Sequence, residues 1–201
     1  VSVGGTAASG AISSACLLRG NFNGSSYTTP FDIKNNIFAS TRTGGTGKHY
    51  AIANNINGTS STTGWSTGAS NYNILNSANA ATVGYWSADR TLATCRSSRS
   101  CDANSYSGTT VTFTNTSTGD LHLNMGTTAN DMESHGTVLA GYNTDYDNDD
   151  RPGPAGSVNG GGFGVDIGAD EFDGVPSDNI PPVIVFTNVT CSIRPVAVFT
   201  R

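Results

Sequence analysis

The sequence contains little lysine, little histidine and no long apolar run. Lysine occurs only at Lys34 and Lys48 and the other basic residues are scattered, so no positive stripe can follow a phosphate backbone. No apolar stretch approaches the ~20 residues that span a bilayer, and residues 1–5 do not resemble an export signal. We therefore expect a soluble segment that neither binds nucleic acid nor spans a membrane, with any export signal or anchor outside it.

Small polar residues make up nearly half of the chain, which contains 25 Gly together with abundant Thr, Ser and Asn. A disordered chain has few aromatic and β-branched residues and a high net charge. Here 8 Phe, 7 Tyr and 2 Trp accompany many Ile and Val, and the formal net charge is only −5. Because the polar residues between the apolar ones favour turns and strands, the composition predicts an all-β chain of many short strands.

A short pattern recurs every 19 residues in the segments 33–38, 52–57 and 71–76. Repeated short strands bounded by Gly, Ser and Thr clusters are typical of a parallel β-solenoid, in which each coil buries its apolar face on the next. The main alternative is a β-sandwich. The solenoid interpretation predicts an aliphatic ladder of Ile37, Ile56 and Leu75 and an amide ladder of Asn35, Asn54 and Asn73.

The region after Trp86 departs from this pattern. Residues 87–94 tolerate a helix and Ser87 is a candidate N-cap, so we expect one or two helical turns. Cys95 and Cys101 are predicted to form a local disulfide, which would indicate an oxidising compartment, and two buried thiols are the alternative. The sequence leaves open whether Cys16 and Cys191 pair.

Several motifs carry a resemblance to a known family. They are Gly47-Lys-His-Tyr-Ala-Ile52, Tyr72-Asn-Ile-Leu75, Gly84-Tyr-Trp86, Asp120-Leu-His-Leu123, the run Asp145-Tyr-Asp-Asn-Asp-Asp-Arg-Pro152 and the ending Asp166-Ile-Gly-Ala-Asp-Glu-Phe172. Together they make residues 33–174 resemble the right-handed parallel β-helix regions of large secreted surface proteins of Bacteroidetes-type bacteria.

The resemblance implies a right-handed parallel β-helix with a short helical insertion and an Asp/Gly-rich C-terminal cap, spanning residues 1–174. It implies that residues 175–201 form a linker and the first strand of a truncated Ig-like module, or a strand that pairs with another subunit. Two departures stand out. Asp149 and Asp150 occupy a place where the family usually has a Gly, and Cys95 and Cys101 are additions.

The C-terminal region is acidic, since nine of the 15 acidic residues lie between positions 145 and 178. Carboxylates at alternate positions lie within reach of one hard cation, and Ca²⁺ binds six to eight oxygen ligands. The alternative is a turn in which Arg151 pairs with one carboxylate and the others cap the backbone. The candidate Ca²⁺ ligands are Asp145, Asp147, Asp149, Asp166 and Asp170.

The remaining candidate residues concern catalysis and sugar binding. Between residues 31 and 119 the only carboxylates are Asp32, Asp89 and Asp102, which are too sparse for an acid/base pair. His49, His122 and His135 occur singly, which favours packing or surface roles. An aromatic strip for stacking glycans, with core packing as its alternative, would comprise Tyr50, Trp65, Tyr72, Tyr85 and Trp86.

We expect from these observations a non-catalytic, extracellular part of a bacterial surface protein, acting as an adhesive element or a spacer. Its partners would be surface glycans or neighbouring copies of itself. A carbohydrate-active enzyme is one alternative. A subunit of an extracellular filament is another, in which the segment 183–189 inserts into a neighbour.

Overall fold

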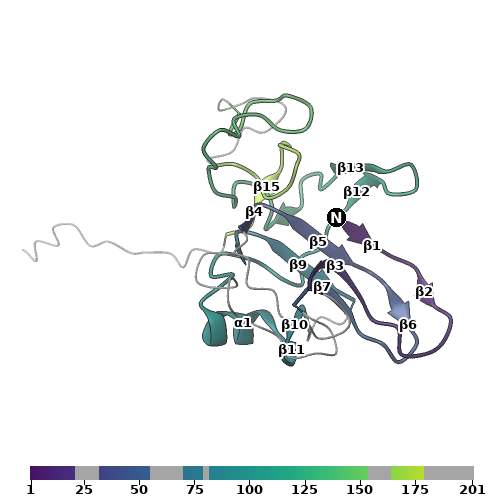
Figure 1. The fold of residues 1–201 in the computed structure, drawn as a ribbon. Helices are drawn as coiled ribbons and strands as arrows, with labels where there is room; N and C mark the ends of the chain where they lie inside the picture. The colour runs from purple at the N-terminus through teal and green to yellow at the C-terminus, as the bar shows by residue number, and fades with distance from the viewer. Residues whose placement is uncertain (21–31, 55–69, 79–81, 154–163, 179–201) are drawn as a thin grey trace, which may run out of the picture.

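A computed structural model describes residues 1–20, 32–54, 70–78, 82–153 and 164–178 (Figure 1). The described elements are short strands and one helix, and no helix among them is long and apolar enough to cross a membrane. In chain order they are β1 (Ser2–Val3), β2 (Thr6–Ala7), β3 (Ser14–Arg19), β4 (Ile33–Lys34), β5 (Ile37–Ser40), β6 (Thr43–Gly44), β7 (His49–Asn54), β8 (Ser70–Asn71), β9 (Ile74–Ser77), β10 (Gly84–Trp86), β11 (Asp89–Arg90), α1 (Leu92–Arg99), β12 (Phe113–Asn115), β13 (Asp120–Leu123), β14 (Ala129–Asn130) and β15 (Val175–Pro176).

These strands form small mixed sheets. The two largest have the orders β1-β5-β9 and β11-β10-β7-β3, and the others have two strands each. The β10–β11 and β12–β13 pairs are antiparallel, whereas β5–β9 and β3–β7 are parallel. The prediction of a right-handed parallel β-helix is therefore wrong, because the described residues form separate small sheets of mixed direction.

The strand pairing does not follow the 19-residue spacing of the sequence pattern. Ile37 pairs with Ile74, and Phe38 pairs with Leu75. Since neighbouring side chains of a strand point to opposite faces, Ile37 and Leu75 lie in different hydrophobic clusters. The aliphatic ladder is thus absent between them, and Ile56 lies outside the described residues.

The predicted amide ladder is also absent. Asn35 hydrogen-bonds through its side chain to the backbone of Thr137, and Asn73 Oδ1 accepts from the backbone N of Asn36. Asn54 is in β7, opposite residues of β3 and β10. The amides of Asn35 and Asn73 satisfy different parts of the backbone, which is the ordinary role of Asn in turns and at strand ends.

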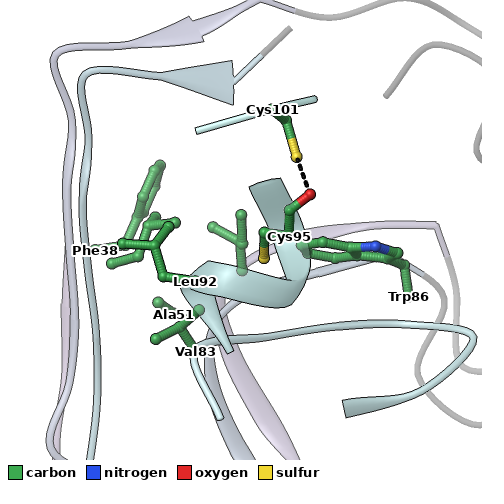
Figure 2. Close-up of a cluster of buried hydrophobic side chains, with 9 residues drawn as sticks. Phe38, Ala51, Val83, Trp86, Leu92, Cys95 and Cys101 are labelled. Carbon is green, nitrogen blue, oxygen red and sulfur yellow. Dashed lines mark hydrogen bonds between the residues drawn. The ribbon is translucent and has the colours of Figure 1, made fainter. Parts of the chain in front are cut away.

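The first hydrophobic cluster packs β7, β9 and β10 against the helix (Figure 2). We call it the helix cluster: Phe38, Ala51, Ile52, Leu75, Val83, Trp86, Leu92, Cys95 and Cys101. A Cβ at Gly84 would lie 2.9 Å from the Trp86 ring and 3.0 Å from the carbonyl O of Ile52, so this close contact requires glycine. The bulk of Trp86 is accommodated by the lack of a side chain at Gly84.

The second cluster connects the sheet β1-β5-β9 with the last described part of the chain. We call it the closing cluster: Ile37, Ala39, Ile74, Met125, Met132, Ile167 and Phe172. Residues 129–153 and 164–178 lie together, in green and yellow, on one side of the β5 and β9 strands (Figure 1). Ile167 and Phe172 are the apolar anchors that hold the acidic C-terminal region on the sheet.

Helix α1 begins later than the sequence predicts. Thr91 is its N-cap and forms a reciprocal capping box with Thr94, and Ser100 ends the helix in a left-handed conformation with φ 52°. Ser87, the expected N-cap, has φ 61° and lies between β10 and β11. The hairpin between these strands uses the residues that the sequence assigned to the first helical turn.

Cys95 and Cys101 are buried thiols in the helix cluster. The Sγ of Cys101 lies 3.7 Å from the carbonyl O of Cys95, to which it donates (Figure 2). Burial raises the pKa of the Cys95 thiol above its usual value. The structure does not contain the disulfide that the sequence predicts between these two residues.

Truncation of a closing-cluster residue tests this packing. Ile74 is 0% exposed, so Ile74→Ala should lower the free energy of unfolding by about 2–5 kcal/mol, because it leaves a cavity. The control Val138→Ala removes a side chain that is 70% exposed and should change it by less than about 0.5 kcal/mol. Chemical denaturation measures both, and equal effects would show that the cluster is not formed.

Candidate functional site

Three parts of the chain meet where the acidic residues gather. They are strand β13, the stretch 145–151, which we call the acidic loop, and residues 164–173, which we call the closing segment. The backbone N of Leu123 in β13 donates to Asp170 Oδ2 at 2.7 Å, and the backbone N of Tyr146 donates to the carbonyl O of Ala169 at 3.0 Å. The closing segment therefore contacts both β13 and the acidic loop.

Asp145 shapes the acidic loop. Its Oδ1 accepts from the backbone N of Asp147 at 2.9 Å and of Asp149 at 2.8 Å. Its Oδ2 accepts from the backbone N of Glu171 at 2.9 Å. One carboxylate thus folds the loop as an Asx-type turn and also ties it to the closing segment.

Arg151 supplies the main fixed positive charge in this region. Its Nε lies 2.7 Å from Oε1 of Glu171, and the two side chains are only 11% and 0% exposed. Its remaining nitrogens donate to the carbonyl O of Asp166 at 2.8 Å and of Gly168 at 3.1 Å. Removing either member of such a buried pair leaves an uncompensated charge, so the pair fixes the closing segment in place.

The carboxylate of Asp166 is hydrogen-bonded to the backbone of Ser134 and of Phe172. Its Oδ1 accepts from the backbone N of Ser134 at 2.7 Å and its Oδ2 from that of Phe172 at 2.9 Å. Burial raises the pKa of Asp166 to about 8 despite these hydrogen bonds. Glu133 lies nearby, and its Oε2 accepts from the backbone N of Gly174 at 2.9 Å. These carboxylates are committed to the backbone.

A cluster of potential metal ligands lies in an open hollow of about 460 Å³ that is lined by residues of β13, the acidic loop and the closing segment. His122, Asp147 and Asp170 each offer one ligand atom, and these atoms lie within 4.8 Å of one another. The imidazole of His122 is held between two carboxylates, with Nδ1 2.5 Å from Asp120 Oδ1 and Nε2 2.6 Å from Asp147 Oδ2. Only Asp147 and Asp170 of the five predicted Ca²⁺ ligands take part in this cluster.

The charge of His122 follows from this geometry. The hydrogen bond that the ring donates to Asp120, followed by the one that it donates to Asp147, raises the pKa of His122 to about 9. The same interaction with His122 lowers the pKa of Asp120. Burial raises the pKa of Asp170. In the absence of another cation, the imidazolium ring therefore compensates the carboxylates of this cluster.

Sequence reasoning assigned His122 to packing or surface and so missed its place in the cluster. A signal was present in the motif Asp120-Leu-His122-Leu. Residues two apart in a strand project from the same face, so Asp120 and His122 point the same way in β13. An acidic residue and a histidine on the same face of a strand are a reason to expect a common binding site. The acidic loop, although distant in sequence, is the segment that could complete it.

Two members of the predicted aromatic strip, Tyr50 and Trp86, are buried, and Tyr72 and Tyr85 are partly exposed. Tyr50 and Trp86 are 2% and 1% exposed, so neither ring face is open to a sugar. Tyr50 donates its hydroxyl hydrogen to Asp89 Oδ1 at 2.8 Å, and its ring centroid is 5.7 Å from that of Tyr85. Tyr72 follows β8 in a left-handed conformation, and Trp65 lies outside the described residues.

No family model matches the chain, and comparisons with curated proteins and with solved structures find no match either. The resemblance to surface proteins of Bacteroidetes-type bacteria therefore stays a prediction.

The histidine between two carboxylates predicts a shifted titration. Because its folded pKa of about 9 exceeds the unfolded value of about 6.5, His122 stabilises the fold fully below about pH 6.5 and loses this effect as the pH rises through 9. NMR titration of the ring should give a midpoint near 9, and Asp120→Asn should move it towards about 6.5. A wild-type midpoint near the unfolded value would contradict the geometry.

Proposed function

We propose that this chain is a non-catalytic, structural domain of an extracellular surface protein, in which the acidic C-terminal region closes the fold. The observation that carries this proposal is how the carboxylates are used. Both oxygens of Asp145 and of Asp166 accept hydrogen bonds from backbone N–H groups of other segments. Groups committed to the backbone in this way stabilise loops and are not free for acid/base chemistry.

The contrast with a carbohydrate-active enzyme supports this role. A glycosidase positions two carboxyl groups about 5–9.5 Å apart on either side of the scissile bond. Glu171 pairs with Arg151, and Glu133 accepts from Gly174 N and Ser134 Oγ. Within the described residues, both carboxylate oxygens of Glu133 and Oε1 of Glu171 have protein partners, which favours structure over catalysis. The extracellular location rests on the resemblance of the acidic motifs.

A second, adhesive function is favoured by a hollow on another part of the surface. Arg42, Lys48 and His49 are among the residues that line this hollow of about 230 Å³. The Nε of Arg42 is buried and has no hydrogen-bond partner among the described residues. Lys48 forms an ion pair with Asp89. The guanidinium of Arg42 brings a positive charge to the lining, which suits a carboxylate or sulfate group, so an acidic glycan is the ligand class that this hollow fits.

Loss of Asp145 tests the structural role. Asp145→Ala removes three hydrogen bonds to the backbone and should lower the free energy of unfolding by roughly 2–4 kcal/mol. Asp150→Ala, a control in the same loop at an exposed position, should change it by less than about 0.5 kcal/mol. Denaturant titration compares the two, and similar values for both would refute a closing role for Asp145.

A glycan array tests adhesion and catalysis together. The full chain should bind uronate or sulfated glycans, and Arg42→Gln should weaken this binding about tenfold because it removes one positive charge from the lining of the hollow. Lys34→Gln, which removes a charge that pairs with Asp32 elsewhere, should bind as the wild type does. Incubation with the same polysaccharides should produce no new reducing ends or unsaturated products. Turnover would overturn the non-catalytic proposal, and equal losses in both variants would overturn the hollow as the binding site.

A further inference from the structure

We propose that His122, Asp147 and Asp170 bind a divalent transition-metal ion of the Zn²⁺ type. This site goes beyond the structural role of the region, because that role needs only the backbone hydrogen bonds of Asp145 and Asp166. An ion here would add a second link among the same three parts of the chain: β13, the acidic loop and the closing segment.

The arrangement is close to that of a metal site. In a tetrahedral Zn²⁺ site with bonds of about 2.0–2.1 Å, ligand atoms are roughly 3.3 Å apart. The three candidate ligand atoms already lie within 4.8 Å of one another, so binding needs a contraction of at most about 1.5 Å. Asp147 is 46% exposed in the acidic loop and His122 is 42% exposed, so both side chains have room to adjust.

The imidazole is oriented in advance. Asp120 Oδ1 lies 2.5 Å from Nδ1 of His122, which leaves Nε2 directed at Asp147. Metal-binding histidines usually donate their other N–H to a carboxylate in this way, which fixes the ring and strengthens the ligand nitrogen. Asp120 is thus a positioning residue, and Asp170 is held by its hydrogen bond from Leu123 N.

A buried carboxylate oxygen of a residue that lines this hollow lacks a donor. Glu171 lines the hollow, its side chain is 0% exposed, and its Oε2 has no hydrogen-bond partner among the described residues. A buried carboxylate oxygen without a donor is costly unless a cation or water lies near it. Asp149 and Asp173 also line the hollow, which makes its potential negative, and its opening to solvent leaves space for water ligands.

The donor set selects the class of ion. One imidazole nitrogen with two carboxylates suits Zn²⁺ and its first-row neighbours. Ca²⁺ prefers six to eight oxygen ligands, and two of the carboxylates that the sequence proposed for it, Asp145 and Asp166, are occupied by backbone N–H groups. We therefore expect Zn²⁺ to bind more tightly than Ca²⁺.

Metal titration of the full chain tests the site. Chelator-treated protein is titrated with Zn²⁺ and separately with Ca²⁺, using calorimetry and native mass spectrometry. We expect one Zn²⁺ per chain, and binding at least tenfold weaker in His122→Gln and in Asp147→Asn. Asp173→Asn is the matched control, because it removes one exposed negative charge from the rim of the same hollow, and it should retain wild-type affinity.

The role of Asp120 has its own readout. Asp120→Asn should weaken Zn²⁺ binding by about 10–100-fold, and in the wild-type chain Zn²⁺ should shift the ¹⁵N resonance of His122 Nε2 far more than that of Nδ1. Wild-type protein that binds no Zn²⁺, a His122 resonance that does not respond, or Asp173→Asn losing as much affinity as His122→Gln would each overturn the site. Such results leave the structural proposal standing, because that depends on the Asp145 variant.

Discussion

Compensation of negative charge is the constraint on which the C-terminal part of this protein depends. Nine of the 15 acidic residues lie between positions 145 and 178, and an uncompensated buried carboxylate is too costly to persist. The chain meets this constraint with backbone N–H groups at Asp145 and Asp166, with Arg151 at Glu171 and with His122 at Asp147. Each of these interactions joins two segments of the chain. The same contacts that neutralise the negative charge therefore also hold the loops in place.

The general character of the fold could be predicted from sequence, but its architecture could not. Composition correctly indicated short strands bounded by polar turns, and the segments around Ile37, Ile52 and Ile74 do form strands. The 19-residue spacing misled because Asn is abundant enough to recur by chance. Pairing is set by which faces are buried, and it places Ile37 beside Ile74 and Phe38 beside Leu75. A local sequence pattern does not reveal which distant strand a segment pairs with.

The candidate site could be predicted only in part, because it too depends on contacts between residues distant in sequence. Alternating carboxylates marked the acidic loop, and Asp147 does contribute to the cluster, but Asp145 is turned inward by the hydrogen bonds that make the turn. Nothing in the local sequence distinguishes the aspartate that caps a turn from the one that points away from it. His122 was missed because its partners are its strand neighbour Asp120 and the distant residues Asp147 and Asp170.

The pairing between β5 and β9 has a consequence for how the molecule comes apart. Ile37 and Ile74 belong to the closing cluster, whereas Phe38 and Leu75 belong to the helix cluster. The β5–β9 pair thus lies between the two clusters and contributes side chains to both. Separating the two strands exposes both cores at once, so neither half has an independent route to unfolding and the described part of the chain should melt in a single cooperative transition.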